Sequence, residues 1–417
     1  MRPVSRRRFL SGAAAAAAAL AGGAGPAAPA TRASLVAAAA EATRAAAEAA
    51  ALPSPESSGI DHVVVVTMEN RSFDHFLGWL PGADGRQAGL TYRDRKGTAH
   101  ATYPLAPDFQ GCGHADPDHS AGGALAQYAG GAMDGFLRSG DSDRFAIGYY
   151  KRADLPFIGE AAVSWTVCDR FFASFLGPTF PNRMYLHAGR TDRTRNTIAI
   201  STLPTIWDRL AAAGLRGTYY TGGLPFLALW GERHRPRTRT FDRFLADCRR
   251  GQLPELSYVD PPFTLAGLVS GEAAGSDDHP HADIRAGEAF LDRVYRAVTA
   301  SPAWSRTLLV ITFDEWGGFF DHVRPERAPD VGGPALRGFR VPCLLISPFA
   351  RRGHVDHGVY DHTSILRLVE WRWGLRPLAP RDASARNLAL ALDLSRRDLA
   401  APSFRVPAAP AGQVCPS

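Results

Sequence analysis

Residues 63–70 read Val-Val-Val-Val-Thr-Met-Glu-Asn, a continuous apolar run that ends in an acid and an amide. A β-branched run without alternation is typical of a strand buried on both faces of a parallel sheet. Residues 307–313 and 341–347 have the same texture, and weaker candidates surround Tyr219 and Tyr258. Helical patterns alternate with these strands, at 204–213, 284–300 and 364–373. We therefore predict an α/β fold with a central, mainly parallel sheet flanked by helices.

The amino-terminal residues 1–30 have the anatomy of a twin-arginine signal peptide. Arg6 and Arg7 stand before Phe9-Leu10, an Ala-rich apolar run follows, and Ala28-Pro29-Ala30 is a candidate cleavage site. The apolar run is shorter than the ~20 residues that span a bilayer. We expect export by the twin-arginine machinery to the cell envelope or the outside, and no transmembrane segment in the mature chain.

Three further segments follow the predicted signal peptide. Residues 31–59 are expected to form an Ala-rich helix and a linker, residues 60–400 one large domain, and residues 401–417 a carboxy-terminal tail. The Gly-, Asp- and Pro-rich stretch 81–150 predicts a long loop insertion. Five cysteines are too few for a disulfide scaffold, and Cys168 and Cys343 are expected to be buried thiols.

The charge excludes several classes of protein. The formal net charge of +6 includes four arginines of residues 1–30, which hold no acid, so the rest of the chain carries +2. A nearly neutral chain gives no reason to expect a nucleic-acid partner. Lys96 and Lys151 are the only lysines, and neither follows a phosphate-binding glycine loop. The motifs of serine esterases, zincin proteases and dinucleotide enzymes are absent from the sequence.

Two predicted strands end in oxygen-bearing side chains: Glu69 and Asn70 after the first, Asp314 and Glu315 after the other. In an open parallel sheet, ligands bind beyond the carboxyl ends of the strands. One such pair would be explained by helix capping. Two pairs favour a shared divalent metal ion, with calcium, magnesium or manganese preferred by oxygen ligands and zinc not excluded.

A nucleophile candidate, Thr179, lies in Gly177-Pro178-Thr179-Phe180-Pro181-Asn182-Arg183. Pro181 suits the first turn of a helix, which would put Thr179 at a helix amino terminus, where a phosphate is favoured. Arg183 is expected to add a bidentate phosphate contact. The alternative is a plain capping threonine. His322, seven residues beyond Glu315, is the strongest histidine candidate for protonating a leaving oxygen.

Five stretches together resemble, in order, the motifs of the bacterial phosphoesterase family that holds phospholipases C and certain acid phosphatases; they are residues 65–76, 177–183, 313–323, 341–349 and 360–364. The resemblance implies an alkaline-phosphatase-like fold with residues 60–400 as catalytic domain. It implies a metal held by Glu69, Asn70, Asp314 and Glu315, with Thr179 as nucleophile and metal neighbour. It also implies active-site roles for His119 and His279, with His322 beside them, and for Asn182 and Arg183 at the substrate. His114, His281 and His362 are weaker candidates.

The function that this resemblance implies is hydrolysis of a phosphate ester by a secreted, metal-dependent enzyme. A phospholipase C-type phosphodiester, cleaved through a Thr179 phosphoenzyme, is the preferred substrate. Only about forty residues follow Leu375, too few for the β-rich domains of long phospholipases C, and no amphipathic helix suited to a bilayer is visible. An acid phosphatase acting on a small phosphomonoester, and a non-catalytic phosphate-binding protein, therefore stay as alternatives.

Overall fold

The computed structural model describes residues 47–48, 50–263, 275–410 and 415. The predicted signal peptide and most of the Ala-rich segment lie outside these residues. Of the predicted linker, a short 3₁₀ turn, Pro55–Ser57, precedes the first strand.

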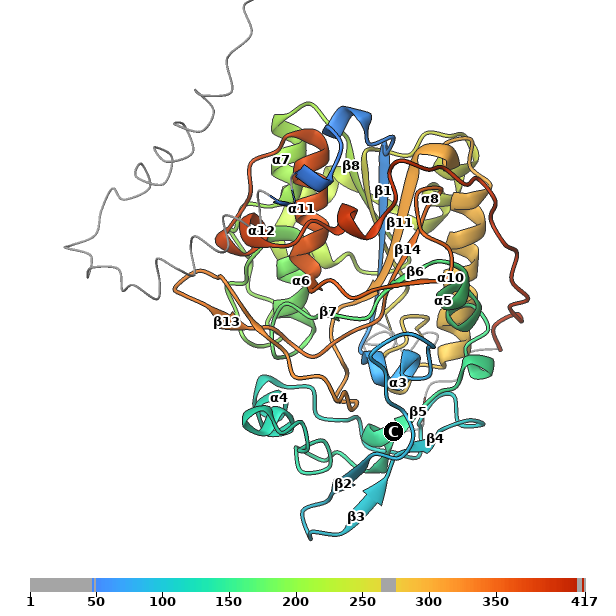
Figure 1. Cartoon of the computed structure of the whole chain (residues 1–417). Coiled ribbons are helices and arrows are strands. Elements are labelled where there is room, and N and C mark those ends of the chain that lie inside the picture. The colour runs from blue at the N-terminus through green and yellow to red at the C-terminus, as the bar shows by residue number, and fades with distance from the viewer. Residues whose placement is uncertain (1–46, 49, 264–274, 411–414, 416–417) are drawn as a thin grey trace, which may run out of the picture. The chain divides into compact units, whose positions relative to one another are not determined.

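An eight-stranded sheet forms the centre of the fold (Figure 1). Its strands are, in spatial order, β15 (His354–Asp356), β6 (Thr166–Cys168), β14 (Cys343–Ile346), β11 (Thr307–Phe313), β1 (His62–Met68), β10 (Leu256–Asp260), β8 (Gly217–Thr221) and β9 (Thr238–Thr240). The five strands from β11 to β9 pair in parallel. The sheet is mixed because β14 runs antiparallel to both β11 and β6. The prediction of a mainly parallel sheet is confirmed, with the strand at 341–347 as its antiparallel exception.

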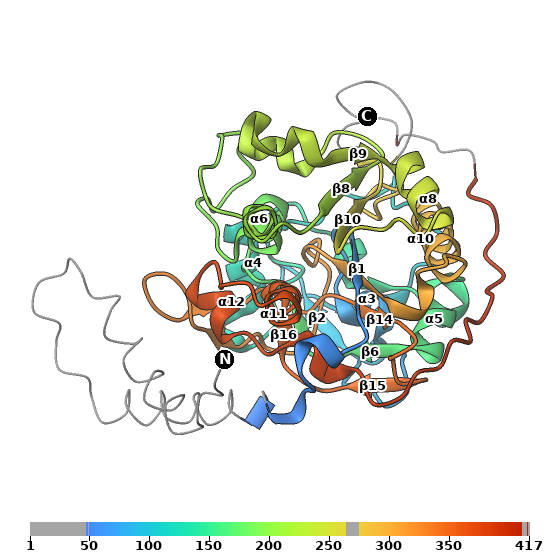
Figure 2. The same cartoon turned by 90° about the horizontal axis from the view of Figure 1, so that it is seen from above.

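Helices cover both faces of this sheet (Figure 2). One face carries α6 (Thr179–Ala188), α11 (His362–Trp373) and α7 (Ile206–Ala212), the last labelled in Figure 1, and the other carries α5 (Ile158–Ser164), α8 (Phe241–Arg249) and α10 (Ile284–Thr299). Every residue of β1 and β11 is buried, as expected for strands covered on both sides. In α10, Phe290, Leu291, Val294 and Val298 recur at helical spacing and are buried.

The predicted insertion is built from short elements below the carboxyl ends of the central strands (Figure 1). It follows α3 (Phe73–Leu77) and holds β2 (Thr91–Arg93), β3 (Ala99–Ala101), β4 (Tyr103–Pro104), α4 (Ala121–Tyr128) and β5 (Gly148–Tyr149). Other short elements include β7 (Phe171–Phe172), η5 (Phe226–Arg237), β12 (Arg327–Ala328), β13 (Ala335–Leu336), β16 (Tyr360–Asp361) and α12 (Pro380–Ser384). A second, smaller apolar cluster joins the insertion to the rest of the domain. In it Phe136 packs against Tyr92 with ring centroids 5.6 Å apart, and Trp316 and Phe339 contribute from outside the insertion.

The carboxy-terminal segment is attached to the domain at two places. Phe404 is buried against Tyr295 of α10, with ring centroids 5.1 Å apart. Cys415 forms a disulfide with Cys112 of the insertion, 303 residues away in sequence. Cys168 and Cys343 are free and buried, as predicted.

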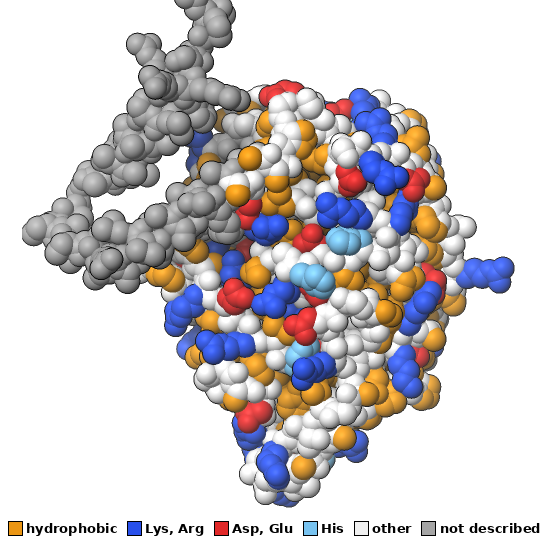
Figure 3. Space-filling view, in the orientation of Figure 1, with side chains coloured by type: hydrophobic (Ala, Val, Ile, Leu, Met, Phe, Trp, Pro, Cys, Tyr) orange, Lys and Arg blue, Asp and Glu red, His pale blue; other side chains and the backbone are white. Residues whose placement is uncertain are grey.

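Two observations concern the surface and the membrane. Arginines and acids are interspersed on the face of the molecule seen in Figure 3, without a field of one sign. Among the described residues, no helix combines the length and apolar character that crossing a bilayer requires.

Candidate active site

The carboxyl ends of β1 and β11 bring four oxygen-bearing side chains together. The two strands pair in parallel register up to Met68 and Phe313, so Glu69 and Asp314 come next on neighbouring strands. The Asp314 carboxylate accepts hydrogen bonds from the backbone N–H of Asn70, at 3.2 Å, and of Glu315, at 2.8 Å. Asn70 turns the chain here with a φ of 61°, a left-handed conformation that asparagine tolerates better than most residues.

This cluster, Glu69, Asn70, Asp314 and Glu315, is buried, and several of its polar atoms lack a partner. Oδ1 and Nδ2 of Asn70 and Oε1 of Glu315 accept or donate no hydrogen bond within the described chain. Burial and the neighbouring Asp314 raise the pKa of both Glu69 and Glu315 well above the ordinary value. Buried polar atoms without partners and mutually repelling carboxylates are costly unless a cation joins them. The donor set therefore fits a hard, oxygen-ligated divalent ion.

The nucleophile candidate lies where predicted, at the start of a helix. Thr179 is the first residue of α6, follows Pro178 as N-cap, and is 7% exposed. Arg183 lies one turn later on the same face of the helix, since residues four apart are neighbours on a helix surface. The Arg183 side chain contacts the acid cluster, so the face of α6 that carries Thr179 is directed toward the same acids.

The contacts of Arg183 differ from the predicted phosphate contact. Its Nη2 lies 3.0 Å from Glu69 Oε1, its Nη1 donates to Asp260 Oδ2 at 3.0 Å, and its Nε donates to Asp314 Oδ2 at 3.2 Å. Nη2 also donates to the carbonyl of Thr67. Although burial works against the charge, the three carboxylates raise the pKa of Arg183. The guanidinium is committed to neutralising strand-end acids, because the helix places it beside them.

Asn182 is also engaged by the protein itself. Its Oδ1 accepts from the N–H of Phe175 at 2.8 Å, and its Nδ2 donates to the carbonyls of Gly177, at 2.8 Å, and Pro178, at 3.1 Å. These bonds hold the loop before Thr179. The Asn182 side chain thus holds the turn before Thr179, and its predicted contact with the substrate stays a prediction.

Two of the predicted histidines meet beside Glu315. His119 Nε2 lies 4.0 Å from Glu315 Oε1, and its Nδ1 is 2.8 Å from the carbonyl oxygen of Pro117. The rings of His119 and His279 have centroids 5.6 Å apart. Together with Asp116 they offer nitrogen and oxygen atoms that all lie within 4.8 Å of one another.

The structure places His322 in a different polar network. Its Nδ1 is 2.5 Å from Asp74 and its Nε2 is 3.1 Å from Asp84. Arg340 completes this network through Asp74 and Asp321. Burial alone would lower the pKa of His322, but the Asp74 carboxylate raises it. None of the hydrogen bonds described for His322 reaches the cluster of strand-end acids.

The weaker histidine candidates also bond within the protein. His362 Nε2 lies 2.9 Å from the carbonyl oxygen of Phe313, at the end of β11. His114 Nδ1 is 2.9 Å from Asp143, and His281 Nε2 is 3.0 Å from the carbonyl oxygen of His114.

Sequence reasoning missed two acids of this region. Asp260 is the last residue of β10, the parallel neighbour of β1, and so lies at the same edge of the sheet as Glu69 and Asp314. The same strand-end rule would have found it, but the strand was weakly marked in sequence. Asp116 lies in the loop insertion, where no periodicity marks its place.

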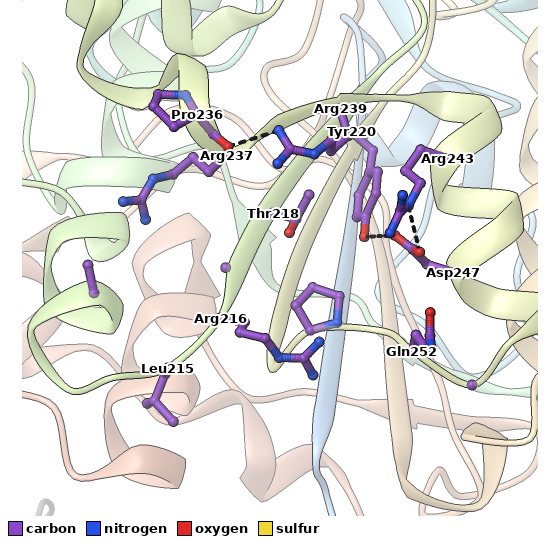
Figure 4. A pocket seen from close by; sticks show the side chains of 14 residues that line it. Leu215, Arg216, Thr218, Tyr220, Pro236, Arg237, Arg239, Arg243, Asp247 and Gln252 are labelled. Carbon is purple, nitrogen blue, oxygen red and sulfur yellow. Dashed lines mark hydrogen bonds and ion pairs between the residues drawn. The ribbon is translucent and has the colours of Figure 1, made fainter.

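A separate pocket of about 630 Å³ lies at the amino ends of β8 and β10, away from these residues (Figure 4). Arginines 216, 237, 239 and 243 line it. Its one acid, Asp247, accepts from Arg243 Nε at 2.8 Å and from the Tyr220 hydroxyl at 2.9 Å. No residue of the acid cluster lines this pocket.

Comparison with known proteins gives consistent results. The sequence model described as "Phosphoesterase family" matches residues 60–376. Non-specific phospholipase C6 of Arabidopsis thaliana is 30% identical over 79% of this chain and 71% of its own length. Phospholipase C B of Mycobacterium tuberculosis is 30% identical over 76% of this chain and 74% of its own length.

Among solved structures, a protein in the alkaline phosphatase superfamily from Vibrio parahaemolyticus matches 79% of this chain and 70% of its own. The two structures align with a TM-score of 0.41 at 10% sequence identity.

Proposed function

The chain belongs to the phosphoesterase family, and from this premise we propose that it is a secreted, metal-dependent hydrolase that cleaves a phospholipase C-type phosphodiester through Thr179. Family membership makes the chain a hydrolase of phosphate esters. The finer proposal is supported above all by the buried acid cluster with its unpartnered Asn70 and Glu315 atoms, beside the helix that begins at Thr179.

Glu69, Asn70, Asp314 and Glu315 would hold the metal ion, with the Thr179 hydroxyl as a further ligand. A bound divalent cation would supply a Lewis acid for the phosphate oxygens and favour deprotonation of the threonine. Oxygen ligands favour calcium, magnesium or manganese, and His119 beside Glu315 keeps zinc among the candidates.

The protein's own residues provide the remaining chemistry. The amino terminus of α6 favours a phosphate next to Thr179. Thr179 Oγ1 forms a bond to phosphorus as the ester bond to the leaving alcohol breaks, and His119 or His279 gives that alcohol a proton. Water then cleaves the phosphothreonine, which releases a phosphate monoester and restores the hydroxyl.

Export is supported by one described feature besides the signal sequence. The Cys112–Cys415 disulfide joins two cysteines distant in sequence, and such bonds persist in oxidising compartments. Replacing Arg6 and Arg7 by lysine tests the route, since the protein would then be retained in the producing cell.

One assay separates the candidate functions. Purified protein is given nitrophenyl phosphorylcholine, nitrophenyl phosphate and phosphatidylcholine, each with and without a chelator. We expect chelator-sensitive turnover of the two diesters. Turnover of the monoester alone would favour an acid phosphatase. If the protein binds phosphate but turns over none of the three esters when metal is added, a non-catalytic binding protein would be favoured.

A further inference from the structure

Exposed apolar side chains occur on two loops that both contact Phe180, the residue next to Thr179. Ile198, Ile200 and Leu224, here called the apolar rim, are 85%, 62% and 70% exposed. Ile198 and Ile200 follow α6, and Leu224 follows β8 at the carboxyl end of its strand. Three other exposed apolar residues, Leu125, Val331 and Leu399, are 61%, 54% and 53% exposed and lie in other parts of the chain.

The two loops are joined to each other at the start of α6. The Asn196 side chain accepts a hydrogen bond from the N–H of Phe180 at 2.8 Å, directly after Thr179. The Phe180 ring packs edge-on against Phe226, two residues beyond Leu224, with centroids 5.5 Å apart. Both loops of the apolar rim thus contact Phe180, one through the Asn196 hydrogen bond and the other through the Phe226 ring.

Positive charge accompanies the apolar rim. Arg190 and Arg195 lie in the loop that carries Ile198 and Ile200, and Arg195 is exposed. The loop also holds Arg193, whose charge is paired with Asp192 at 2.7 Å. Two arginines therefore remain in excess over the acids of this loop. Apolar tips flanked by basic residues suit a membrane interface, where the apolar groups enter the acyl boundary and the arginines meet lipid phosphates.

We propose that the apolar rim docks the protein on a phospholipid surface and so presents a lipid phosphodiester to Thr179. Exposing three large apolar side chains on the loops that contact Phe180 is unfavourable in water, and binding of a small, fully hydrated ester would not require it. This inference rests on the proposed function for the reaction, but not for the docking, which is measured without turnover.

The test uses vesicles of phosphatidylcholine, alone or with phosphatidylglycerol, and the full chain. The variant Ile198→Ser/Ile200→Ser/Leu224→Ser is compared with the matched control Val331→Ser/Leu399→Ser. We expect the first variant to lose about tenfold or more of vesicle binding and of vesicle lipid hydrolysis. Its kcat/KM on soluble nitrophenyl phosphorylcholine should stay that of the wild type. The control variant should match the wild type in vesicle binding, in hydrolysis of vesicle lipid and in kcat/KM on the soluble diester.

A charge variant provides an independent measurement. Phosphatidylglycerol in the vesicles should increase the affinity of the wild type, and added salt should reduce this increase. The variant Arg190→Gln/Arg195→Gln should lose about fivefold of the increase per charge removed.

The outcomes distinguish docking from catalysis. Vesicle binding by the wild type without hydrolysis of any ester would keep the docking surface and refute the proposed function. If the wild type hydrolyses the soluble diester but the rim variant binds vesicles as well as the wild type does, the docking surface is refuted and the proposed function is kept. A protein dimer that dissociates in the rim variant, with no vesicle binding by the wild type, would assign the rim to a second copy of the chain and also overturn the proposal.

Discussion

Arg183 and Glu69 form a buried ion pair, with 3.0 Å between Nη2 and Oε1 and side chains only 2% and 9% exposed. The positive charge of Arg183 does not fully offset the burial of Glu69 and the negative charge of its neighbours. Burial and Asp314 still raise the pKa of Glu69, outweighing Arg183. One guanidinium thus faces several carboxylates, and the remaining negative charge is what a divalent cation would neutralise.

The first prediction concerns the stability that Arg183 provides. Arg183→Met should lower the free energy of unfolding by roughly 3–5 kcal/mol, because it leaves buried carboxylates without their partner. Urea denaturation measures the change, with the exposed Arg195→Met as control. If Arg183 were only a phosphate ligand, the variant would keep its stability and show a raised KM instead.

The second prediction concerns the nucleophile. Thr179→Ala should lower kcat by about 10³-fold or more, since the alanine side chain cannot form the covalent intermediate. Thr179→Ser keeps a hydroxyl and should retain measurable turnover, and the exposed Thr194→Ala should behave as the wild type. Near-normal turnover in the alanine variant would remove Thr179 from the reaction.

The third prediction separates the leaving-group acid from other roles. The rate in His119→Asn or His279→Asn should fall about 10²–10⁴-fold with an alkyl leaving group. With nitrophenol the loss should be much smaller, because that group leaves without a proton. An equal loss with both leaving groups would show that the histidine positions other groups.

The fourth prediction tests whether His322 stabilises the fold through Asp74 and Asp84 and takes no part in catalysis. His322→Asn should cost about 1–3 kcal/mol of unfolding free energy, since Asp74 loses a buried partner. Its kcat should stay close to that of the wild type. A drop in kcat comparable to that of His119→Asn, at unchanged stability, would return His322 to the catalytic group.

Much of the fold was predictable because buried strands and helices have a strong period or texture. The run at 307–313 coincides with β11, and the helix expected at 284–300 coincides with α10 to within one residue. The direction of β14 was not predictable, since an apolar strand buried on both faces has the same sequence in either orientation. Nor was the Cys112–Cys415 pair, because its members are brought together only by the finished fold.

The acid cluster was predictable for a geometric reason. Side chains that follow adjacent parallel strands must meet at one edge of the sheet, and Glu69 and Asp314 do so. The hydrogen-bond partners of Arg183 and Asn182 were not predictable. A position on a helix fixes the direction of a side chain, but not which of several acceptors lies within about 3 Å of it. The hydrogen-bond partners of His322, Asp74 and Asp84, were not predictable for a related reason. The closeness of His322 to Glu315 in sequence is undone by the turn at Gly317 and Gly318, whose φ values are 66° and 76°.

The last prediction concerns pH and lies outside the active site. Glu288 of α10 is buried and accepts hydrogen bonds from the N–H groups of Phe157 and Ile158, and burial raises its pKa to about 8. The folded protein therefore holds a proton that the unfolded chain releases near its ordinary pKa of 4.5. The stabilisation is fully present below that value, and it is lost as pH rises through about 8.

Unfolding free energy should accordingly fall between these two pH values, by at most about 1.4 kcal/mol per pH unit from this group. Glu288→Gln, which mimics the protonated carboxyl, should flatten that part of the profile. The control Glu232→Gln changes an exposed acid and should leave the slope unchanged. A wild-type slope that persists in Glu288→Gln would assign the pH dependence to another buried acid, since the amide keeps the acceptor for both N–H groups but cannot titrate.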